Sequence, residues 1–415
     1  MNILIVSQYF WPENFRVNDL ASALAENGHR VTVLTGIPNY PEGTAFPDYL
    51  KRPDHFARLG AVEIVRIPMV LRGSGSLRLA LNYATFALSA STFGAWKLRG
   101  RKFDAVIGIA LSPITAVIPA IVQKRLKSAP LATWVFDLWP ESLAAVGITR
   151  NELVLRSVGK MVSWIYQSSE IILAQSRSFL EHARNYAPET PAVYLPSWSE
   201  EIFEQHPEPA TLGPGFNIVF AGNIGDAQDF PAILRAIKAL PSDANIHLWV
   251  AGDGRAATWL EGQVAAQGLS ESVSLLGRRP LDEMPSLFAS ADALLVTLRD
   301  DPNLSMTIPG KVQSYLAAAR PVLAMMNGEG QQAIVESGAG LVASAGDHET
   351  LSHLILTMAA MEREERTQLG RNGRSYYDAN FSRSAVVDRL ILLLSDVRSQ
   401  TLRQSEDSRS STEGS

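Results

Sequence analysis

Residues 2–29 read NILIVSQYFWPENFRVNDLASALAENGH, and residues 216–240 read FNIVFAGNIGDAQDFPAILRAIKAL. Each stretch begins with a short apolar run typical of a buried strand, passes through a turn, and continues with apolar residues at helical spacing. Such a turn presents free backbone N–H groups and the positive end of a helix dipole, which suit a phosphate. The repeated unit therefore predicts two Rossmann-like halves that face each other across a ligand-binding cleft.

Length and composition favour a globular protein of two domains. The chain has 415 residues, of which 46% are apolar, and this length suits two α/β domains of roughly 200 residues each. Because the chain contains no cysteine, a disulfide framework and a thiolate metal site are excluded. The 7 histidines show no paired spacing, so we expect no metal site, and we interpret His29 as structural. A strand follows Met1 directly, so we expect no signal peptide and a cytoplasmic protein.

Strands and helices alternate along the first half, which predicts a parallel sheet covered by helices on both faces. Periodicity predicts helices near Val17–Asn27, Leu153–Ser168 and Phe179–Arg184, with a long helix-compatible segment at residues 77–102. The predicted strands are Ile3–Gln8, Arg30–Thr35, Ala61–Ile67, Ala105–Ile109, Leu131–Phe136 and Ala192–Leu195.

The second half repeats this alternation after a linker rich in proline and glycine, residues 206–215. We therefore predict domains at 1–205 and 216–380, and a disordered, serine-rich tail at 396–415. The predicted strands are Asn217–Ala221, His247–Ala251, Val273–Leu276, Ala293–Thr297 and Pro321–Met325, and the predicted helices are Pro231–Leu240, Ala256–Gln267, Asp282–Ser290 and Lys311–Ala319.

The stretch from Arg66 to Lys102 contains no acidic residue, although basic residues cluster at both of its ends. Polar residues interrupt its apolar segment, residues 77–102, before it reaches the length of a membrane span. Basic ends attract anionic lipid, and its aromatic side chains suit the membrane interface, so one interpretation is a helix lying on a membrane surface. The alternative is a core helix that covers one face of the first sheet.

Three features of the second half suit a phosphate group. Gly222 and Gly225 follow a predicted strand, where small residues allow close approach to the backbone, and Gly252 follows the next strand. Lys311 opens a predicted helix, where its ammonium group can neutralise an anion. A tight connection between elements and an exposed helical lysine remain the alternatives for these residues.

Seven motifs follow one another along the chain: GHRVTVLTGIPNYPEG, DLWPES, FAGNIGDAQ, VAGDGR, LLGRRPLDEMPSLFASADALLV, TIPGKVQSYLAAARPVLA and NGEG. Together they resemble the family 4 retaining glycosyltransferases of the GT-B fold. More narrowly, the chain is similar to the subgroup of bacterial fucosaminyltransferase-like proteins of colanic acid and O-antigen synthesis. The resemblance extends over about residues 1–395.

The resemblance implies that the second domain binds a nucleotide-sugar donor, that the first binds an acceptor, and that a C-terminal helix, residues 384–395, crosses back to the first domain. No cofactor, metal ion or nucleic-acid partner is implied. Lys311 is expected to pair with the diphosphate and Arg278 to contact the base. The other expected donor-binding residues are Gly222, Asn223, Gly225, Gln228, Gly252, Ser305, Met306, Thr307, Ser314 and Glu329.

The sequence departs from the family pattern at four charged positions. Met306 and Ser314 replace the two glutamates of an E-x7-E pair, the second of which binds ribose in many members. Asn223 and Gln228 replace the arginine and lysine that often hold the diphosphate. Lys311 is therefore expected to carry more of the leaving-group stabilisation, with Arg299 as a possible helper.

In the first domain, Asp137 and Glu141 follow a predicted buried strand, at the edge where an α/β crevice opens. We expect one of them to orient or deprotonate the acceptor hydroxyl. The alternative is a helix-capping Asp137 and a solvent-exposed Glu141. Phe136 stands where family members often have a histidine. Glu13, Asn14 and Arg16, in the first loop, are expected on the acceptor side.

The favoured function is transfer of a sugar, such as an N-acetylated deoxyhexose, from a UDP-linked donor to a polyprenyl-diphosphate-linked saccharide at the inner face of the cytoplasmic membrane. Arg66–Lys102 would then contact the lipid surface. Two alternatives remain open. One is a sugar-nucleotide epimerase of the same architecture, and the other is a catalytically silent protein that binds nucleotide sugars.

Overall fold

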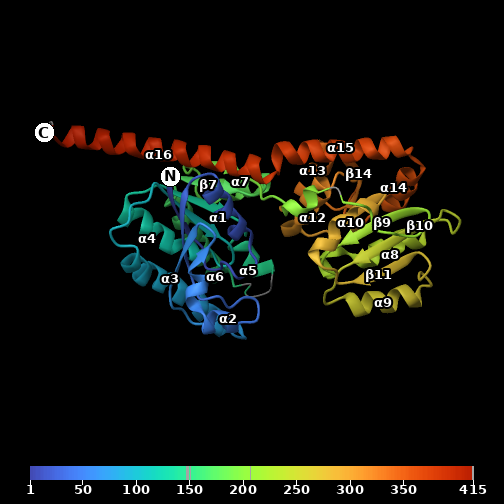
Figure 1. Cartoon of the computed structure of the whole chain (residues 1–415), viewed down its shortest axis with the longest axis horizontal. Coiled ribbons are helices and arrows are strands. Elements are labelled where there is room, and N and C mark those ends of the chain that lie inside the picture. Colours follow the sequence, from blue (N-terminus) through green and yellow to red (C-terminus); the bar gives the residue numbers. More distant parts are fainter. Residues whose placement is uncertain (146–148, 150, 206, 414–415) are drawn as a thin grey trace. The chain divides into compact units, whose positions relative to one another are not determined.

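The computed structural model describes residues 1–145, 149, 151–205 and 207–413. Figure 1 shows two α/β units, each containing its own sheet. One compact unit comprises Met1–Leu195 together with Val387–Ser415, and the other comprises Pro196–Val386. The predicted two-domain α/β fold class is confirmed.

Among the described residues, the sheet of the first unit has eight strands in the order β3-β4-β2-β1-β5-β6-β7-β8. The strands pair in parallel, apart from the antiparallel pair β3 and β4. Their apolar side chains are buried, as expected for a sheet covered on both faces. The strands are β1 (Asn2–Val6), β2 (Arg30–Thr35), β3 (Arg58–Leu59), β4 (Val62–Arg66), β5 (Ala105–Ala110), β6 (Leu131–Val135), β7 (Ile171–Ala174) and β8 (Ala192–Tyr194).

The helices of the first unit connect these parallel strands. The helices are α1 (Arg16–Glu26), α2 (Pro47–Lys51), α3 (Ser76–Lys97), α4 (Ile118–Lys127), α5 (Glu141–Ala145), α6 (Glu152–Gln167) and α7 (Arg177–Tyr186). The elements α2, α4, α5, β3 and β7 were not predicted. Strand β7 is a run of only four buried residues, too short for periodicity to distinguish a strand from part of a helix.

The sheet of the second unit has six parallel strands among the described residues, in the order β11-β10-β9-β12-β13-β14. The strands are β9 (Phe216–Ala221), β10 (Ile246–Ala251), β11 (Val273–Gly277), β12 (Ala293–Thr297), β13 (Val322–Met325) and β14 (Gly340–Ala343). The helices are α8 (Phe230–Lys238), α9 (Ala257–Ala266), α10 (Met284–Ser290), α11 (Pro302–Ser305), α12 (Gly310–Ala317), α13 (Glu329–Ser337), α14 (His348–Ala360) and α15 (Arg363–Asn380).

Strand β14 and helices α11, α13, α14 and α15 were not predicted. The first residue of β14 explains why this strand pairs so closely with β13. Gly340 lies opposite Val322, and a Cβ atom on Gly340 would stand 1.8 Å from the Val322 carbonyl oxygen. A glycine is therefore required at this position, although it weakens the strand pattern in the sequence.

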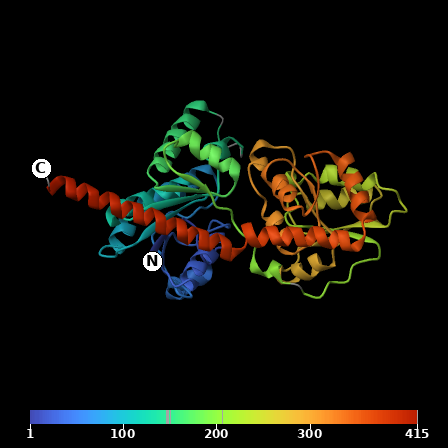
Figure 2. The ribbon, with the colours of Figure 1, turned by 90° about the horizontal axis from the view of Figure 1, so that it is seen from above.

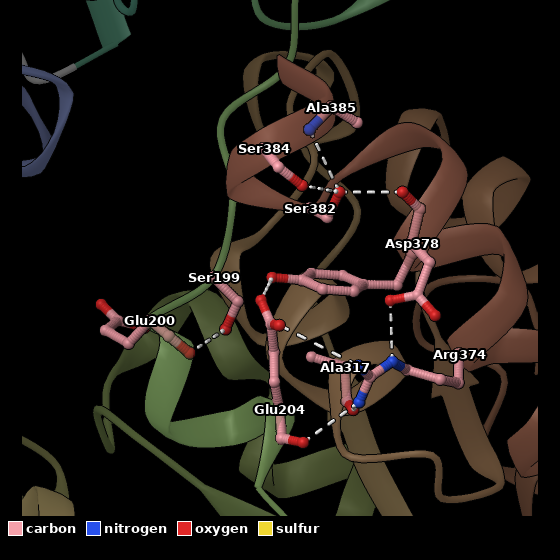
Figure 3. A network of polar contacts seen from close by, with 10 residues as sticks. Ser199, Glu200, Glu204, Ala317, Arg374, Asp378, Ser382, Ser384 and Ala385 are labelled. Atoms are coloured by element: carbon pink, nitrogen blue, oxygen red, sulfur yellow. Dashed lines mark hydrogen bonds and ion pairs between the residues drawn. The ribbon is translucent and has the colours of Figure 1, made fainter. Parts of the chain in front are cut away.

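The residues just before β9 pack on the second unit. Gln313 Nε2 donates a 2.7 Å hydrogen bond to the Ser197 carbonyl, and Ser199 Oγ donates one of 3.0 Å to Ser314 Oγ. Figure 3 shows the neighbouring network, in which the Tyr377 hydroxyl donates to Glu204 Oε1 over 2.8 Å. The first compact stretch therefore ends at Leu195, before the boundary at residue 205 that the sequence indicates.

Helix α16 (Arg383–Glu413) begins in the second unit and continues, from Val387 onward, in the first. Figure 2 shows it as one long helix, in red. In the first unit it buries Leu390 and Leu394, and Arg398 Nη2 lies 2.8 Å from Asp104 Oδ1. The expected crossover helix at 384–395 is therefore present.

Helix α16 also continues through residues 396–413 of the tail that the serine-rich composition predicts to be disordered. The ion pair between Arg398 and Asp104 holds the start of this region against the first unit, a contact that composition alone does not reveal. Residues 414 and 415 lie outside the described part of the chain.

We expect Tyr377→Phe to lower the free energy of unfolding of the second unit by about 1–2 kcal/mol, because the buried tyrosine loses its hydrogen bond to a carboxylate. Chemical denaturation monitors the change. Tyr376→Phe is the matched control, because the exposed Tyr376 hydroxyl donates to Glu336, and we expect a loss below about 0.5 kcal/mol. Equal losses in the two variants would contradict a structural role for the Tyr377 contact.

Candidate active site

A pocket of about 920 Å³ opens in the second unit, where strands β9 and β10 end and helix α12 begins. Its position at the carboxyl ends of parallel strands is where open α/β sheets bind ligands. Six residues that the sequence singles out for donor binding or catalysis line this pocket: Gly222, Asn223, Gly252, Arg278, Lys311 and Ser314.

Two glycine turns form one side of this pocket, and their backbones touch. A Cβ atom on Gly252 would stand 1.8 Å from the Gly222 carbonyl oxygen. Ile224 N donates a 2.8 Å hydrogen bond to the Asp253 carbonyl, which joins the turn after β9 to the turn after β10. Glycine at 252 is therefore a packing requirement. The resulting surface exposes backbone without side chains, as close approach by a phosphate requires.

The Lys311 amine lies buried beneath the first of these turns. Its Nζ atom is 3.7 Å from the centroid of the Phe220 ring and has no hydrogen-bond partner among the described residues. Burial lowers the pKa of Lys311 to about 7. A Cβ atom on Gly222 would stand 2.5 Å from Lys311 Cε, so Gly222 also provides the space that the lysine occupies. The pocket therefore holds a desolvated amine whose protonated form an anion would stabilise.

Another part of the pocket wall is apolar and aromatic. Phe203 stacks on Phe288 with ring centroids 5.1 Å apart, and Phe288 meets Tyr315 edge-to-face at 5.2 Å. Met284, Pro280 and Leu281 complete this wall. Flat apolar surfaces of this kind suit a planar heterocycle, whereas the glycine turns suit a charged group.

Gln228 supports the first glycine turn from outside the pocket. Its Oε1 atom accepts hydrogen bonds from Gly225 N at 3.2 Å and from Asn223 Nδ2 at 3.5 Å. The two neutral residues that replace charged family residues thus contact each other. Arg299, the expected helper, lies 3.4 Å from Asp301 in an ion pair.

The remaining expected donor residues lie outside the residues that line the pocket. Ser305 and Thr307 hydroxyls donate to backbone carbonyls within their own loop, which also contains Met306. The Ser305 carbonyl would stand 2.0 Å from a Cβ atom on Gly328, so this loop packs on the turn that precedes Glu329. Local packing thus brings the Ser305–Thr307 loop and the start of α13 together.

In the first unit, Asp137 and Glu141 follow strand β6, as predicted. Asp137 accepts hydrogen bonds from Ser142 Oγ and, at 3.2 Å, from Trp139 Nε1. Glu141 Oε2 lies 3.0 Å from His182 Nε2, and Glu141 Oε1 accepts from the Tyr186 hydroxyl at 3.1 Å. Burial acts to raise the pKa of Glu141, but the hydrogen bond from His182 and other polar contacts lower it overall. Glu141 is therefore held in an ionised state, and sequence reasoning missed its histidine partner.

Glu13 organises the first loop. It is buried, and Oε1 accepts hydrogen bonds of 2.7 Å from both Asn39 N and Tyr40 N, while Oε2 accepts one of 3.0 Å from Phe10 N. Burial raises the pKa of Glu13, and these N–H groups oppose that effect. Asn14 is exposed beside it, and Arg16 begins α1. The contacts of Glu13 give it a role in holding two loops together.

A polar cluster that sequence reasoning missed lies near Asp137. Arg72 Nη1 donates a 3.2 Å hydrogen bond to the Tyr9 hydroxyl, and the guanidinium lies 5.2 Å from the Tyr40 ring centroid. Burial raises the pKa of Tyr83, the nearby charge of Arg72 acts to lower it, and the charge of Asp137 acts to raise it. Arg72 makes no ion pair with a carboxylate within the described part of the chain. The cluster combines aromatic faces with an uncompensated cation.

Helix α3 has one buried and one exposed apolar face. Phe86 and Ala90 are buried in the first unit, whereas Leu77, Leu88 and Trp96 are 76%, 68% and 60% exposed. The interpretation as a core helix therefore describes one face of α3, and membrane contact by the exposed face stays a prediction. No helix within the described ranges has the length and apolar character needed to span a membrane.

Arg66, at the start of the predicted surface stretch, has a different environment from the cations that follow. Its guanidinium donates to the Gly36 carbonyl at 2.8 Å and to the Trp11 carbonyl, and burial lowers its pKa to about 10. Arg101 forms a 2.7 Å ion pair with Glu63. Arg66 therefore holds loops together within the first unit, and membrane contact by the stretch Arg66–Lys102 stays a prediction.

Comparison with known proteins adds a family to this geometry. The family model described as "Glycosyl transferase 4-like domain" matches residues 14–198, and the model described as "Glycosyl transferases group 1" matches residues 215–360. The Escherichia coli (strain K12) protein "Putative colanic acid biosynthesis glycosyl transferase WcaI" is 24% identical over 342 residues, covering 76% of this chain and 81% of its own length. The Rhizobium meliloti (strain 1021) protein "Lipopolysaccharide core biosynthesis glycosyltransferase LpsE" is 25% identical over 178 residues, covering 43% of this chain and 49% of its own.

Solved structures with the same fold cover nearly the whole chain. Sucrose-phosphate synthase from Thermosynechococcus elongatus superimposes with a TM-score of 0.70 at 15% identity, over 96% of this chain and 99% of that structure. Anabaena HepE, in complex with UDP and glucose, gives a TM-score of 0.64 at 14% identity, over 95% and 100%. The chain therefore belongs to the group 1 glycosyltransferases and has the GT-B fold.

Proposed function

We propose that this glycosyltransferase transfers a sugar, with retention of anomeric configuration, from a UDP-linked donor to a lipid-linked saccharide during assembly of a bacterial surface polysaccharide. The favoured donor sugar is an N-acetylated deoxyhexose such as L-fucosamine. The observation that carries the proposal is the buried, unpaired amine of Lys311 at the glycine-lined end of a nucleotide-sized pocket.

The pocket supports a nucleoside diphosphate in both charge and shape. The diphosphate would lie on the turns at Gly222 and Gly252, within reach of the Lys311 amine, and the base would lie toward Phe203 and Phe288. A relative of the same fold, HepE, has been solved with UDP and glucose. The names of WcaI and LpsE support a role in surface polysaccharide synthesis.

In the proposed reaction, the bond between the anomeric carbon and the diphosphate oxygen breaks, and the acceptor hydroxyl oxygen bonds to that carbon. Protonated Lys311 would stabilise the negative charge that accumulates on the leaving diphosphate. The acceptor proton needs a base, and Asp137 is the favoured group for orienting or accepting it. Glu141, already bound by His182 and Tyr186, is better suited to positioning the loop that contains Asp137.

Two features of the first unit support a lipid-linked acceptor. The cluster of Tyr9, Tyr40 and Arg72 offers aromatic faces for a sugar and a cation for a phosphate. Helix α3 exposes leucine and tryptophan side chains, and Lys97 and Arg99 lie at its C-terminal end. We therefore propose that α3 contacts the inner surface of the cytoplasmic membrane, where such an acceptor resides.

A panel of nucleotide sugars, offered with and without a polyprenyl-diphosphate-linked saccharide, tests the proposed function. We expect one UDP-sugar to release nucleotide only when the acceptor is present, with the sugar recovered on the acceptor. Interconversion of a donor with its epimer in the absence of acceptor would favour the epimerase alternative. Binding of a donor without turnover would favour the catalytically silent alternative.

Lys311→Met tests the role of the buried amine through stability and binding together. In the wild type, the Lys311 amine of the folded protein binds a proton less readily than that of the unfolded chain, because burial lowers the pKa of Lys311 from 10.5 to about 7. Burial of Lys311 therefore lowers the free energy of unfolding by its full amount below pH 7, and this loss disappears as the pH approaches 10.5. The variant should therefore be more stable by about 1–4 kcal/mol at pH 6.

The same variant should bind UDP at least roughly tenfold more weakly and lose most transfer, since a charge-assisted contact is lost. Differential scanning fluorimetry across pH and calorimetric titration with UDP measure the two effects. Lys238→Met is the matched control, because Lys238 is exposed on α8 of the same unit, and both properties should stay near wild type. A destabilised Lys311→Met protein with normal UDP affinity would remove Lys311 from the mechanism.

If α3 contacts the membrane, a triple variant with glutamine at Leu77, Leu88 and Trp96 should bind anionic phosphatidylglycerol vesicles roughly tenfold or more weakly than wild type. The reason is that apolar side chains no longer enter the membrane interface. Vesicle co-sedimentation at low and high salt measures it. The control changes Trp259 and Val335, which are 42% and 58% exposed in the second unit, to glutamine. Equal vesicle binding by the two variants would rule out α3 as the contact surface.

A further inference from the structure

A nucleotide in the pocket needs a third contact, in addition to those of its diphosphate and its base. This inference rests on the proposed function, in which the diphosphate lies near Lys311 and the base lies near Phe203 and Phe288. Between a diphosphate and a base lies ribose, whose 2′ and 3′ hydroxyls are two adjacent hydrogen-bond donors. A carboxylate, which accepts hydrogen bonds at both oxygens, matches such a diol.

Helix α12 contributes Ser314 to the pocket, but the Ser314 hydroxyl already makes two hydrogen bonds within the unit. Ser314 lies three residues after Lys311, about 4.5 Å along the helix axis. Its Oγ atom donates to the Gly310 carbonyl at 3.1 Å and accepts from Ser199 Oγ at 3.0 Å. Ser314 therefore uses its hydroxyl to fix the segment that contains Ser199.

That segment carries Glu200, which lines the same pocket. Ser199 is held by α12, and the short 3-10 helix Glu201–Glu204 follows Glu200. The helix places Phe203 against Phe288 and Glu204 against Tyr377, over 2.8 Å. Glu200 thus lies between two anchored residues of the chain. Ser199 is bonded to Ser314 of α12, and Phe203 belongs to the aromatic wall of the pocket.

Figure 3 shows how the carboxylates of this segment differ. Glu204 points into the network with Arg374 and Tyr377, where it serves packing within the unit. The side chain of Glu200 extends away from that network. Since Glu200 also lines the pocket, the two glutamates have separate roles despite their proximity in sequence.

Asp253 is the other carboxylate among the residues that line the pocket, and it belongs to the phosphate end. Its Oδ1 atom accepts a 2.7 Å hydrogen bond from Gly254 N, within the second glycine turn, and its side chain is exposed. Asp253 therefore shapes the turn on which the diphosphate would lie, whereas Glu200 lies toward the base.

We propose that Glu200 binds the ribose hydroxyls of the donor nucleotide and makes the pocket selective for ribonucleotides. The contact comes from the segment that precedes β9, and helix α12 positions that segment through the bond between Ser314 and Ser199. Glu200 is thus a specificity-determining residue that touches the substrate at a point remote from the reacting carbon.

Calorimetric titration with UDP and with 2′,3′-dideoxy-UDP tests this inference. The wild-type protein should bind the dideoxy compound roughly tenfold to a hundredfold more weakly, the range expected for hydrogen bonds to a charged group. Glu200→Ala should bind UDP as weakly as the dideoxy compound and should bind the dideoxy compound within about twofold of wild type. Glu200→Gln, which keeps the shape of the side chain, should show an intermediate ratio.

Glu201→Ala is the matched control, because it removes a neighbouring carboxylate that pairs with Arg383 at 3.4 Å and does not line the pocket. Its preference for UDP should equal that of wild type. A wild-type preference that persists in both Glu200 variants, with normal melting temperatures, would overturn the inference while leaving UDP binding intact. Failure of the wild type to bind UDP, or another nucleoside diphosphate identified by the donor panel, would overturn the proposed function as well.

Discussion

The close contact between the two glycine turns of the second unit is the constraint on which the pocket depends. Because the Gly252 Cα approaches the Gly222 carbonyl too closely for any side chain, the ends of β9 and β10 meet as bare backbone. Gly222 in turn leaves the space in which the Lys311 stem and amine lie. The amine loses hydration at this position, and this desolvation lowers the pKa of Lys311 to about 7. A pocket that destabilises the protonated form of Lys311 is well suited to an anionic ligand, because the bound anion would relieve that destabilisation.

The two units contribute different chemistry. The second unit provides a pocket in which backbone, one cation and aromatic rings are already in place, and residues 196–204 complete it by packing on α12 and α15. The first unit brings Tyr9, Arg72, Tyr83 and Asp137 near one another, and Tyr83 belongs to α3, the helix with an exposed apolar face. The preformed pocket of the second unit suits a donor that is the same in many reactions. The residues of the first unit suit an acceptor that differs among relatives.

Sequence patterns predicted the elements that have strong local signals. The strands at Arg30–Thr35 and Ala293–Thr297 match the expected ranges because buried β-branched runs are distinctive. Short or glycine-containing elements such as β7 and β14 were missed, since pairing with neighbours defines them. For the site, turn chemistry identified Gly222, Gly252 and Lys311. Glu200 and His182 lie in stretches without a motif, and only tertiary packing brings Glu200 to the pocket and His182 to Glu141. Arg72 was predicted only as part of the basic stretch Arg66–Lys102, and its contact with Tyr9 is likewise tertiary.

Helix α16 links the order of synthesis to the order of folding. Residues from Val387 onward complete the first unit, where Leu390 and Leu394 are buried and Ser395 Oγ approaches Met1 Sδ at 3.9 Å. A ribosome therefore makes the whole of the second unit before it supplies the last helix of the first. The nascent first unit carries an uncovered apolar surface during that interval, a period in which domains are vulnerable to aggregation and to chaperone capture. Helix α16, the last element to be synthesised, thus covers the apolar surface of the first unit.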